Sequence, residues 1–125
     1  ERAARLAGGV GRVGAPEEVG AADVVVNATP LGMGTVAALD GSPEPLPVDP
    51  ERLGQGQVVV DLVYHPPTTP LLQAARERGA VAVNGVGMLV HQAAHAYRIW
   101  THEEPPLAAM SAAALAALQD RSKSR

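Results

Sequence analysis

The stretch NGVGMLVHQAAHAYRIWT, residues Asn84 to Thr101, decides the fold because it joins a glycine-rich turn to a long helix with an apolar stripe. Its apolar side chains recur every three or four residues, which is the spacing of one buried helical face. The expected buried face consists of Val86, Leu89, Val90, Ala93, Ala96, Tyr97 and Trp100. Taken alone, this stretch also fits a plain core helix after a glycine turn.

A second edge of the same helix carries Met88, Gln92 and His95. Residues four apart lie above one another on a helix, so Met88 and Gln92 can contact two neighbouring parts of one bound molecule. Gly85 and Gly87 allow the backbone to come close to that molecule. The sequence therefore predicts a candidate binding edge at the start of this helix.

Three apolar runs upstream predict the strands of a parallel sheet. The runs ADVVVN (22–27) and VVVDLV (58–63) have the continuous β-branched character of strands buried on both faces, and AVAV (80–83) forms a third strand. A helix is expected between the second and third strands, because Thr69 suits an N-cap, Pro70 the first helical position and Gly79 the position past the end. The expected inner face of that helix is formed by Leu71, Leu72 and Ala75.

Strand, helix and strand with short connections form a βαβ unit, whose crossover is right-handed in nearly all proteins. The fold class expected from these elements is α/β, with a parallel sheet that is followed by C-terminal helices. These helices are expected at about 86–101 and 107–119, and the whole chain, 1–125, is expected to be one part of a larger domain.

The N-terminal segment begins as a helix, residues 1–7, that Gly8 and Gly9 end. The following GVGRVG, residues 9–14, formally matches the dinucleotide-binding pattern GxGxxG. That pattern binds phosphate only when a strand precedes it and a helix follows, whereas here a helix precedes it and only the short turn 16–19 follows. We expect a loop at this place, with one short strand at 10–13.

The remaining segments are a long loop and a last helix. Residues 34–56 are rich in proline, glycine and acids, which indicates a surface loop with one helical turn at 50–53. The last helix should bury one face and be followed by a solvated tail, residues 120–125. Its expected inner face is formed by Leu107, Met110, Ser111, Ala114, Leu115 and Leu118.

Composition excludes several classes of protein. The 125 residues suffice for one domain, and with no Phe the core must be built from Ala, Val and Leu. A net charge of −3 without a basic cluster argues against nucleic acid or an anionic membrane as partner. No cysteine is available for disulfides or thiolate chemistry, and no apolar run approaches a membrane span, so a soluble cytoplasmic protein is expected.

Ligands of open parallel α/β sheets bind beyond the carboxyl ends of the strands. Three such ends carry unusual residues, at 27–29, 62–64 and 84–87, and neighbouring parallel strands would bring all three loops to one edge. Asp61 lies inside an apolar strand, where we expect a carboxylate that is hydrogen-bonded at the sheet end. His91 and His95 have zinc-ligand spacing, but Gln92 replaces the Glu of a hydrolytic HExxH site and no third ligand is apparent, so no metal is expected.

The three loops together resemble a known family. NATPLGM (27–33), DLVYHPPTTPLL (61–72) and NGVGMLVHQAAHAYRIWT (84–101) look like successive C-terminal motifs of shikimate dehydrogenase. The resemblance covers essentially the whole chain. It implies that the parallel sheet is part of a Rossmann-type domain that binds NADP(H), and that this chain contains only a partial Rossmann-type sheet. It also implies a hydride transfer between the nicotinamide and C3 of shikimate or 3-dehydroshikimate.

The resemblance also implies roles for individual residues. Leu62 and Gly85 match residues that contact the cofactor through their backbone, and Met88 matches one that packs against the nicotinamide, with Thr29 in the loop beside it. Tyr64 and Gln92 match side chains that hydrogen-bond the substrate. Arg2 resembles the last Arg of the family's NRTxxRA motif, where it would help hold the 2′-phosphate of NADP.

Other parts of the family pattern do not occur in this chain. The catalytic Lys-Asp pair, the serine-rich substrate motif and the GxGGxxxA phosphate loop belong upstream of Glu1, and Lys123 cannot replace the catalytic lysine. The chain is therefore expected to be the C-terminal part of an NADP-dependent enzyme of chorismate biosynthesis, inactive by itself and marginally stable. A homodimer is compatible with the complete protein. Two alternatives stay open: an NAD-dependent quinate/shikimate dehydrogenase, and a non-catalytic remnant that acts as an interaction module.

Overall fold

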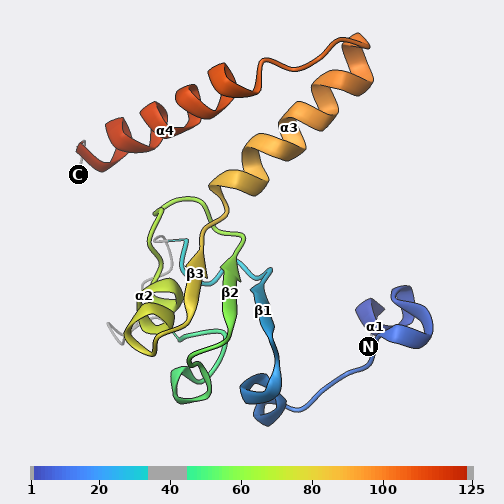
Figure 1. Ribbon diagram of the computed structural model, residues 1–125, viewed down its shortest axis with the longest axis vertical. Helices are drawn as coiled ribbons and strands as arrows, with labels where there is room; N and C mark the ends of the chain where they lie inside the picture. The colour runs from blue at the N-terminus through green and yellow to red at the C-terminus, as the bar shows by residue number, and fades with distance from the viewer. Residues whose placement is uncertain (1, 34–44, 124–125) are drawn as a thin grey trace.

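The computed structural model describes residues 2–33 and 45–123, and its centre is a small parallel sheet (Figure 1). The strands are β1 (Val24–Asn27), β2 (Val58–Asp61) and β3 (Val81–Val83), and they lie in the order β1-β2-β3. Parallel register pairs Asn27 with Asp61 at the carboxyl ends of β1 and β2. The expected parallel sheet is thus confirmed, with strands that are slightly shorter than the apolar runs.

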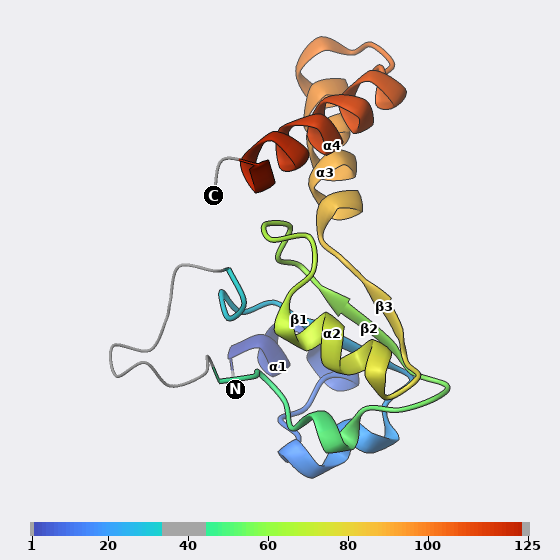
Figure 2. The ribbon, with the colours of Figure 1, turned by 90° about the vertical axis from the view of Figure 1, so that its left-hand side faces the viewer.

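Helix α2 (Pro70–Glu77) connects β2 to β3 and covers one face of the sheet (Figure 2). The Thr69 hydroxyl accepts the N–H of Leu72, Pro70 occupies the first turn, and Gly79 adopts a φ of +80°, as the sequence predicts. The core beneath α2 is formed by Val25, Leu53, Val59, Leu71, Leu72, Ala75 and Ala80. The predicted inner face of α2 is therefore confirmed.

The opposite face of the sheet is open, which corrects the expectation of strands buried on both faces. Val24 and Val26 of β1 are 55% and 54% exposed, and Val81 and Val83 of β3 are 61% and 42% exposed. Their neighbours Val25 and Val59 point to the covered face and are buried. Because no described element packs on the open face, the alternation of burial is set by α2 alone.

Two long helices, α3 (Val86–Thr101) and α4 (Leu107–Lys123), pack against each other beyond the carboxyl edge of the sheet (Figure 1). Their existence is confirmed, but α4 continues to Lys123, so the expected tail from 120 onward is wrong in its first residues. Of the expected buried face of α3, Val86 and Val90 are buried and Trp100 is 80% exposed, and the buried Ala94 was not expected there. The remaining members of that face are half-buried: Leu89, Ala93, Ala96 and Tyr97.

Trp100 was expected on the buried face because the apolar spacing continues to it. It is exposed because α3 extends past the sheet, so that its last turns contact only α4. On α4 the expected inner face is confirmed at Leu118, which is buried, but Leu107 and Leu115 are 39% and 53% exposed.

The N-terminal segment lies beyond the β1 edge of the sheet (Figure 1). It forms α1 (Arg2–Leu6) and the 3₁₀ helices η1 (Gly8–Val10) and η2 (Pro16–Ala21). The short strand expected at 10–13 does not form, because Val10 belongs to η1 and the next residues have no regular structure.

A third 3₁₀ helix, η3 (Pro50–Arg52), confirms the helical turn expected at 50–53. The rest of the long loop expected at 34–56 lies partly outside the described residues, at 34–44. None of the described helices combines the length and the apolar composition that a membrane crossing requires.

Candidate functional site

A pocket of about 490 Å³ lies at the carboxyl ends of β1 and β2, between the two loops that leave these strands. This is the edge at which open parallel sheets bind ligands, and the volume falls in the range of small-molecule sites. The pocket is lined by Ala28, Thr29, Pro30, Met33, Leu62, Val63, Tyr64 and His65. We refer to it as the rim pocket.

Three of the predicted site residues, Thr29, Leu62 and Tyr64, line the rim pocket. Thr29 is held by Asn27, whose side-chain oxygen accepts the Thr29 N–H at 3.0 Å and the Thr29 hydroxyl at 2.7 Å. Tyr64 is 36% exposed, and its hydroxyl has no hydrogen-bond partner among the residues that the structure describes. The Thr29 hydroxyl is therefore held in place by Asn27, whereas the Tyr64 hydroxyl is available to a ligand.

The third loop, which leads from β3 into α3, packs against the second. Gly85 is buried and donates its N–H to the Val63 carbonyl at 3.1 Å, and a Cβ added to it would stand 2.2 Å from the Leu62 carbonyl oxygen. Only glycine permits this approach. The Gly85 carbonyl accepts the N–H of Leu89, so both polar backbone groups of Gly85 are bonded within the chain.

Asn84 connects this third loop to the segment before α2. Its amide donates to the Pro67 carbonyl at 3.2 Å, and its side-chain oxygen accepts the Val86 N–H at 3.2 Å. The first turn of α3 is thereby fixed relative to the loop that carries Tyr64. The convergence of three loops at one edge, predicted from the sequence, is thus present in the structure.

Met88 and Gln92 lie on α3 and do not line the rim pocket. Both are exposed, Met88 by 42%, and the Gln92 amide donates to the Leu89 carbonyl at 2.9 Å. They share the exposed edge that the sequence predicts for them. Arg2 belongs to α1, which packs against η1 beyond the β1 edge, and it is not brought to the pocket.

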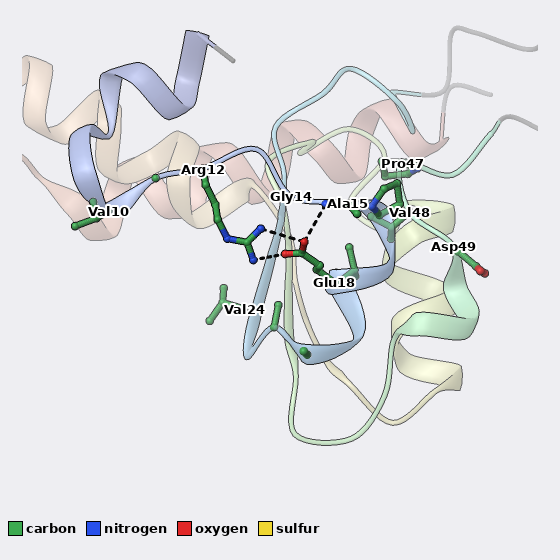
Figure 3. A pocket seen from close by; sticks show the side chains of 14 residues that line it. Val10, Arg12, Gly14, Ala15, Glu18, Val24, Pro47, Val48 and Asp49 are labelled. Atoms are coloured by element: carbon green, nitrogen blue, oxygen red, sulfur yellow. Dashed lines mark hydrogen bonds and ion pairs between the residues drawn. The ribbon is translucent and has the colours of Figure 1, made fainter.

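A larger pocket, of about 1100 Å³, lies at the amino end of β1, between the N-terminal segment and the loop at 47–49 (Figure 3). Arg12 donates to the carboxylate of Glu18 across it, and Glu18 also accepts the Ala15 N–H at 3.2 Å. This ion pair raises the pKa of Arg12 and lowers that of Glu18, mainly through their side-chain hydrogen bond. The two charges neutralise each other, and the pocket lies away from the carboxyl ends of the strands, so we assign the site to the smaller rim pocket.

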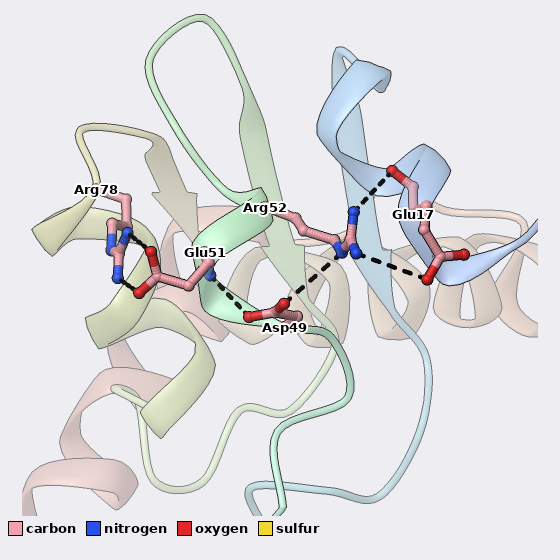
Figure 4. A network of polar contacts seen from close by, with 5 residues as sticks. All are labelled: Glu17, Asp49, Glu51, Arg52 and Arg78. Carbon is pink, nitrogen blue, oxygen red and sulfur yellow. Dashed lines mark hydrogen bonds and ion pairs between the residues drawn. The ribbon is translucent and has the colours of Figure 1, made fainter.

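The amino ends of the strands are tied together by a separate surface network (Figure 4). Arg78, after α2, donates to the Glu51 carboxylate of η3, and this hydrogen bond lowers the pKa of Glu51 and raises that of Arg78. Arg52 joins Glu17 at 3.6 Å and Asp49 at 3.7 Å. All these groups lie away from the rim pocket and contribute to the support of the sheet.

Met33 and His65 line the rim pocket but were not predicted as site residues, although they belong to the motifs 27–33 and 61–72. Only their position in the sequence could have indicated this role, since each lies within a few residues of the end of a strand. Within the described ranges, no group of three His, Cys, Asp or Glu side chains is close enough to hold a metal ion.

Comparison with known proteins agrees with this arrangement. A family model described as "Shikimate 5'-dehydrogenase C-terminal domain" matches residues 85–115. The shikimate dehydrogenase (NADP(+)) of Archaeoglobus fulgidus is 48% identical over 100 residues, which cover 80% of this chain and 35% of that protein. The chain thus spans about a third of the length of the curated relatives that it matches.

Two solved structures are similar in both sequence and fold. Shikimate 5-dehydrogenase from Thermus thermophilus in complex with NADP(H) and shikimate has a TM-score of 0.72 and 34% identity, covering 86% of this chain and 38% of that one. Quinate dehydrogenase from Corynebacterium glutamicum in complex with NAD has a TM-score of 0.67 and 39% identity, covering 80% of this chain and 33% of that one. The resemblance of this chain to the C-terminal part of shikimate dehydrogenase is thereby confirmed.

Proposed function

We propose that this chain is the nicotinamide side of an NADP-linked shikimate dehydrogenase, which interconverts 3-dehydroshikimate and shikimate in chorismate biosynthesis. The observation that carries the proposal is the rim pocket, because Thr29, Leu62 and Tyr64, which match the family's site motifs, line one pocket at the strand ends. The 48% identity to a shikimate dehydrogenase (NADP(+)) supports the same reaction.

The residues of the rim pocket fit the nicotinamide end of the cofactor. A flat ring with an amide group needs apolar walls and a few hydrogen-bonding groups, and Pro30, Met33 and Val63 provide such walls beside the hydroxyls of Thr29 and Tyr64. No phosphate cradle is present in the described part of the chain: the glycine-rich segment at 9–14 begins within η1, after α1, and precedes η2, rather than joining a strand to an α-helix.

Each proposed contact follows from where the structure places the residue. Leu62 would contact the nicotinamide from the end of β2, and Gly85, whose polar groups are bonded internally, would contribute close packing rather than a hydrogen bond. Met88 would pack on the ring from the first turns of α3. Tyr64 would donate its hydroxyl to the substrate, and Gln92 would hydrogen-bond a substrate hydroxyl from the next turn of the helix.

When bound, the nicotinamide supplies or accepts the hydride at C3 of the substrate. The residues of this chain would bind and orient the reactants, since holding the reacting atoms aligned and about 3 to 3.5 Å apart accounts for a large part of such rate enhancement. The proton at the reacting oxygen would be handled by the Lys-Asp pair of the substrate domain, which together with the phosphate loop would be supplied by sequence outside this chain. Arg2 would reach the 2′-phosphate only as part of that more complete domain.

The test is a matrix of steady-state rates for the complete polypeptide that carries this chain, with shikimate or quinate and with NADP or NAD. The proposal predicts that shikimate with NADP gives the highest kcat/KM. Absence of shikimate turnover with either cofactor would contradict it, and would favour a non-catalytic interaction module.

A second candidate is an NAD-dependent quinate/shikimate dehydrogenase, favoured by the 39% identity to quinate dehydrogenase in complex with NAD. It differs in cofactor and substrate preference and uses the same rim pocket. A higher kcat/KM for quinate with NAD in the same matrix would decide for it. We also propose a cytoplasmic location, where the NADP pool of biosynthesis is found, and cell fractionation tests this.

A further inference from the structure

The carboxylate of Asp61 lies at the end of β2 and is completely buried. One of its oxygens accepts the Asn27 amide at 3.0 Å and the Val63 N–H at 3.1 Å, and the other accepts the Thr69 hydroxyl at 2.6 Å. A buried carboxylate is costly unless donors surround it, and these donors come from β1, from the loop after β2 and from the N-cap of α2. Asp61 therefore joins three elements that diverge at the edge of the sheet.

The first of these bonds fixes how Asn27 is oriented. The Asn27 NH₂ group donates to Asp61 and, at 3.3 Å, to the Leu31 carbonyl, so its side-chain oxygen faces the other way. That oxygen accepts both the N–H and the hydroxyl of Thr29, at 3.0 and 2.7 Å. Asp61, which makes the shorter of the two bonds to this amide, thus helps to set the position of Thr29 in the rim pocket through Asn27.

The other two bonds fix the opposite wall of the pocket. The Val63 N–H bond holds the backbone immediately before Tyr64, and the Thr69 bond anchors the far end of the loop that carries Tyr64. The first loop also packs on this centre: a Cβ added to Gly32, whose φ is +93°, would lie 3.2 Å from Cβ of Thr69. Both walls of the rim pocket therefore rest on Asp61 and its partner Thr69.

We infer that Asp61 is a positioning residue of the rim pocket, whose carboxylate holds Thr29 and Tyr64 at a fixed separation so that cofactor and substrate are aligned. The inference rests on the proposed function for its catalytic readout. Asp61 itself has no contact with the pocket space, since it is not among the residues that line it. It acts through Asn27, Val63 and Thr69.

Asp61→Asn in the complete polypeptide is the direct test. It keeps the size of the side chain but replaces one accepting oxygen by an NH₂ group, which cannot accept a hydrogen bond from Asn27, Val63 or Thr69. We expect kcat with shikimate to fall by about tenfold to a hundredfold, since a displacement of about 1 Å at a reacting centre has an effect of that order. The KM for NADP should change by less than about threefold, because the loss concerns alignment rather than uniform binding.

Gln57 provides a matched control at the opposite end of the same strands. It is 6% exposed, its amide donates to the carbonyls of Val19 and Ala22 at 2.9 Å each, and its oxygen accepts the Gly54 N–H at 2.8 Å. Gln57→Glu exchanges amide and acid in the reverse direction and should lower Tm while kcat stays within about twofold. Equal losses of kcat in the two variants, or an unchanged kcat in Asp61→Asn, would overturn the inference.

Thr69 keeps the inference testable if Asp61→Asn does not fold. Thr69→Val removes the hydroxyl at nearly constant volume and should lower kcat, whereas Thr69→Ser retains the hydroxyl and should restore it. Loss of kcat in both variants to the same extent would contradict the role of this hydrogen bond. If the unsubstituted protein does not turn over shikimate, the proposed function is refuted. If it is active and the Asp61→Asn variant is equally active, only the positioning role of Asp61 is refuted.

Discussion

Gly85 lies so close to Leu62 that an added Cβ would stand 2.2 Å from the Leu62 carbonyl oxygen and 2.6 Å from its carbonyl carbon. This contact joins the turn before α3 to the end of β2 and leaves no room for any side chain. The family resemblance predicts that both residues contact the cofactor, and this close approach explains why residue 85 has to be glycine.

The first prediction concerns Gly85→Ala. The variant must separate α3 from β2, because both nearest atoms belong to backbone, and overpacking of this kind costs about 1 to 3 kcal/mol or more of unfolding free energy. Gly87→Ala is the control, since nothing lies within 4 Å of its added Cβ and alanine favours a helix. Denaturant unfolding of the complete polypeptide should show a loss for the first and no loss for the second. Equal stability of both variants would disprove the close approach.

The second prediction concerns the exposed edge of α3. Gln92→Ala should raise the KM for shikimate more than the KM for NADP, because a lost hydrogen bond to a substrate hydroxyl costs about 0.5 to 1.5 kcal/mol. His91→Ala, at the preceding exposed position of the same helix, should have little effect on either constant. A Gln92 variant with an unchanged KM for shikimate and a raised KM for NADP would show that this edge is assigned wrongly.

The sequence predicted the parallel strands, α2 with its cap and the start of α3, because each is specified by local spacing and by Thr69, Pro70 and Gly79. It could not predict the exposure of Trp100, since the apolar spacing continues although no element covers the end of α3. It expected Asp61 to be hydrogen-bonded, which is confirmed, but its partner Thr69 was visible only as an N-cap. The spacing of apolar residues indicates which face of a single helix or strand is apolar. Contacts such as that of Asp61 with Thr69 depend on how separate elements pack together.

A third prediction follows from the open face of the sheet, where Val24, Val26 and Val81 are more than half exposed. Residues 1–125 expressed alone should self-associate, because an exposed apolar sheet face and the free edge of β1 both favour association. Replacement of Val24 and Val26 by Thr should reduce the sedimentation coefficient at a given concentration. A wild-type fragment that sediments as a monomer at all concentrations would show that this face is better protected than the structure indicates.

The fourth prediction concerns pH and the ion pair of Arg78 with Glu51. The hydrogen bond from Arg78 lowers the pKa of Glu51 below its ordinary value of 4.5, so the pair stabilises the fold above that value. This contribution is lost as the pH falls through the lowered pKa of the folded state. Glu51→Gln should therefore lower Tm near neutral pH and have no effect well below about pH 4.

Glu103→Gln is the control for this pair, since Glu103 has no ion-pair partner among the described residues. It should leave Tm unchanged across the same pH range. A constant difference in Tm between Glu51→Gln and the unchanged protein, at acid as well as neutral pH, would show that the effect comes from packing and not from charge.

The central claim, that the rim pocket and the first turns of α3 hold the nicotinamide, is tested most directly by NMR of methionine methyl groups. The chain has three methionines: Met33 lines the rim pocket, Met88 lies on the exposed edge of α3, and Met110 lies on α4. The complete polypeptide, labelled with ¹³C at methionine methyls and assigned by single Met→Leu variants, would be titrated with NADP⁺. We predict ring-current shifts of Met33 and Met88 that saturate together, with Met110 unchanged; saturable NADP⁺ binding that leaves Met33 and Met88 unshifted would contradict the account.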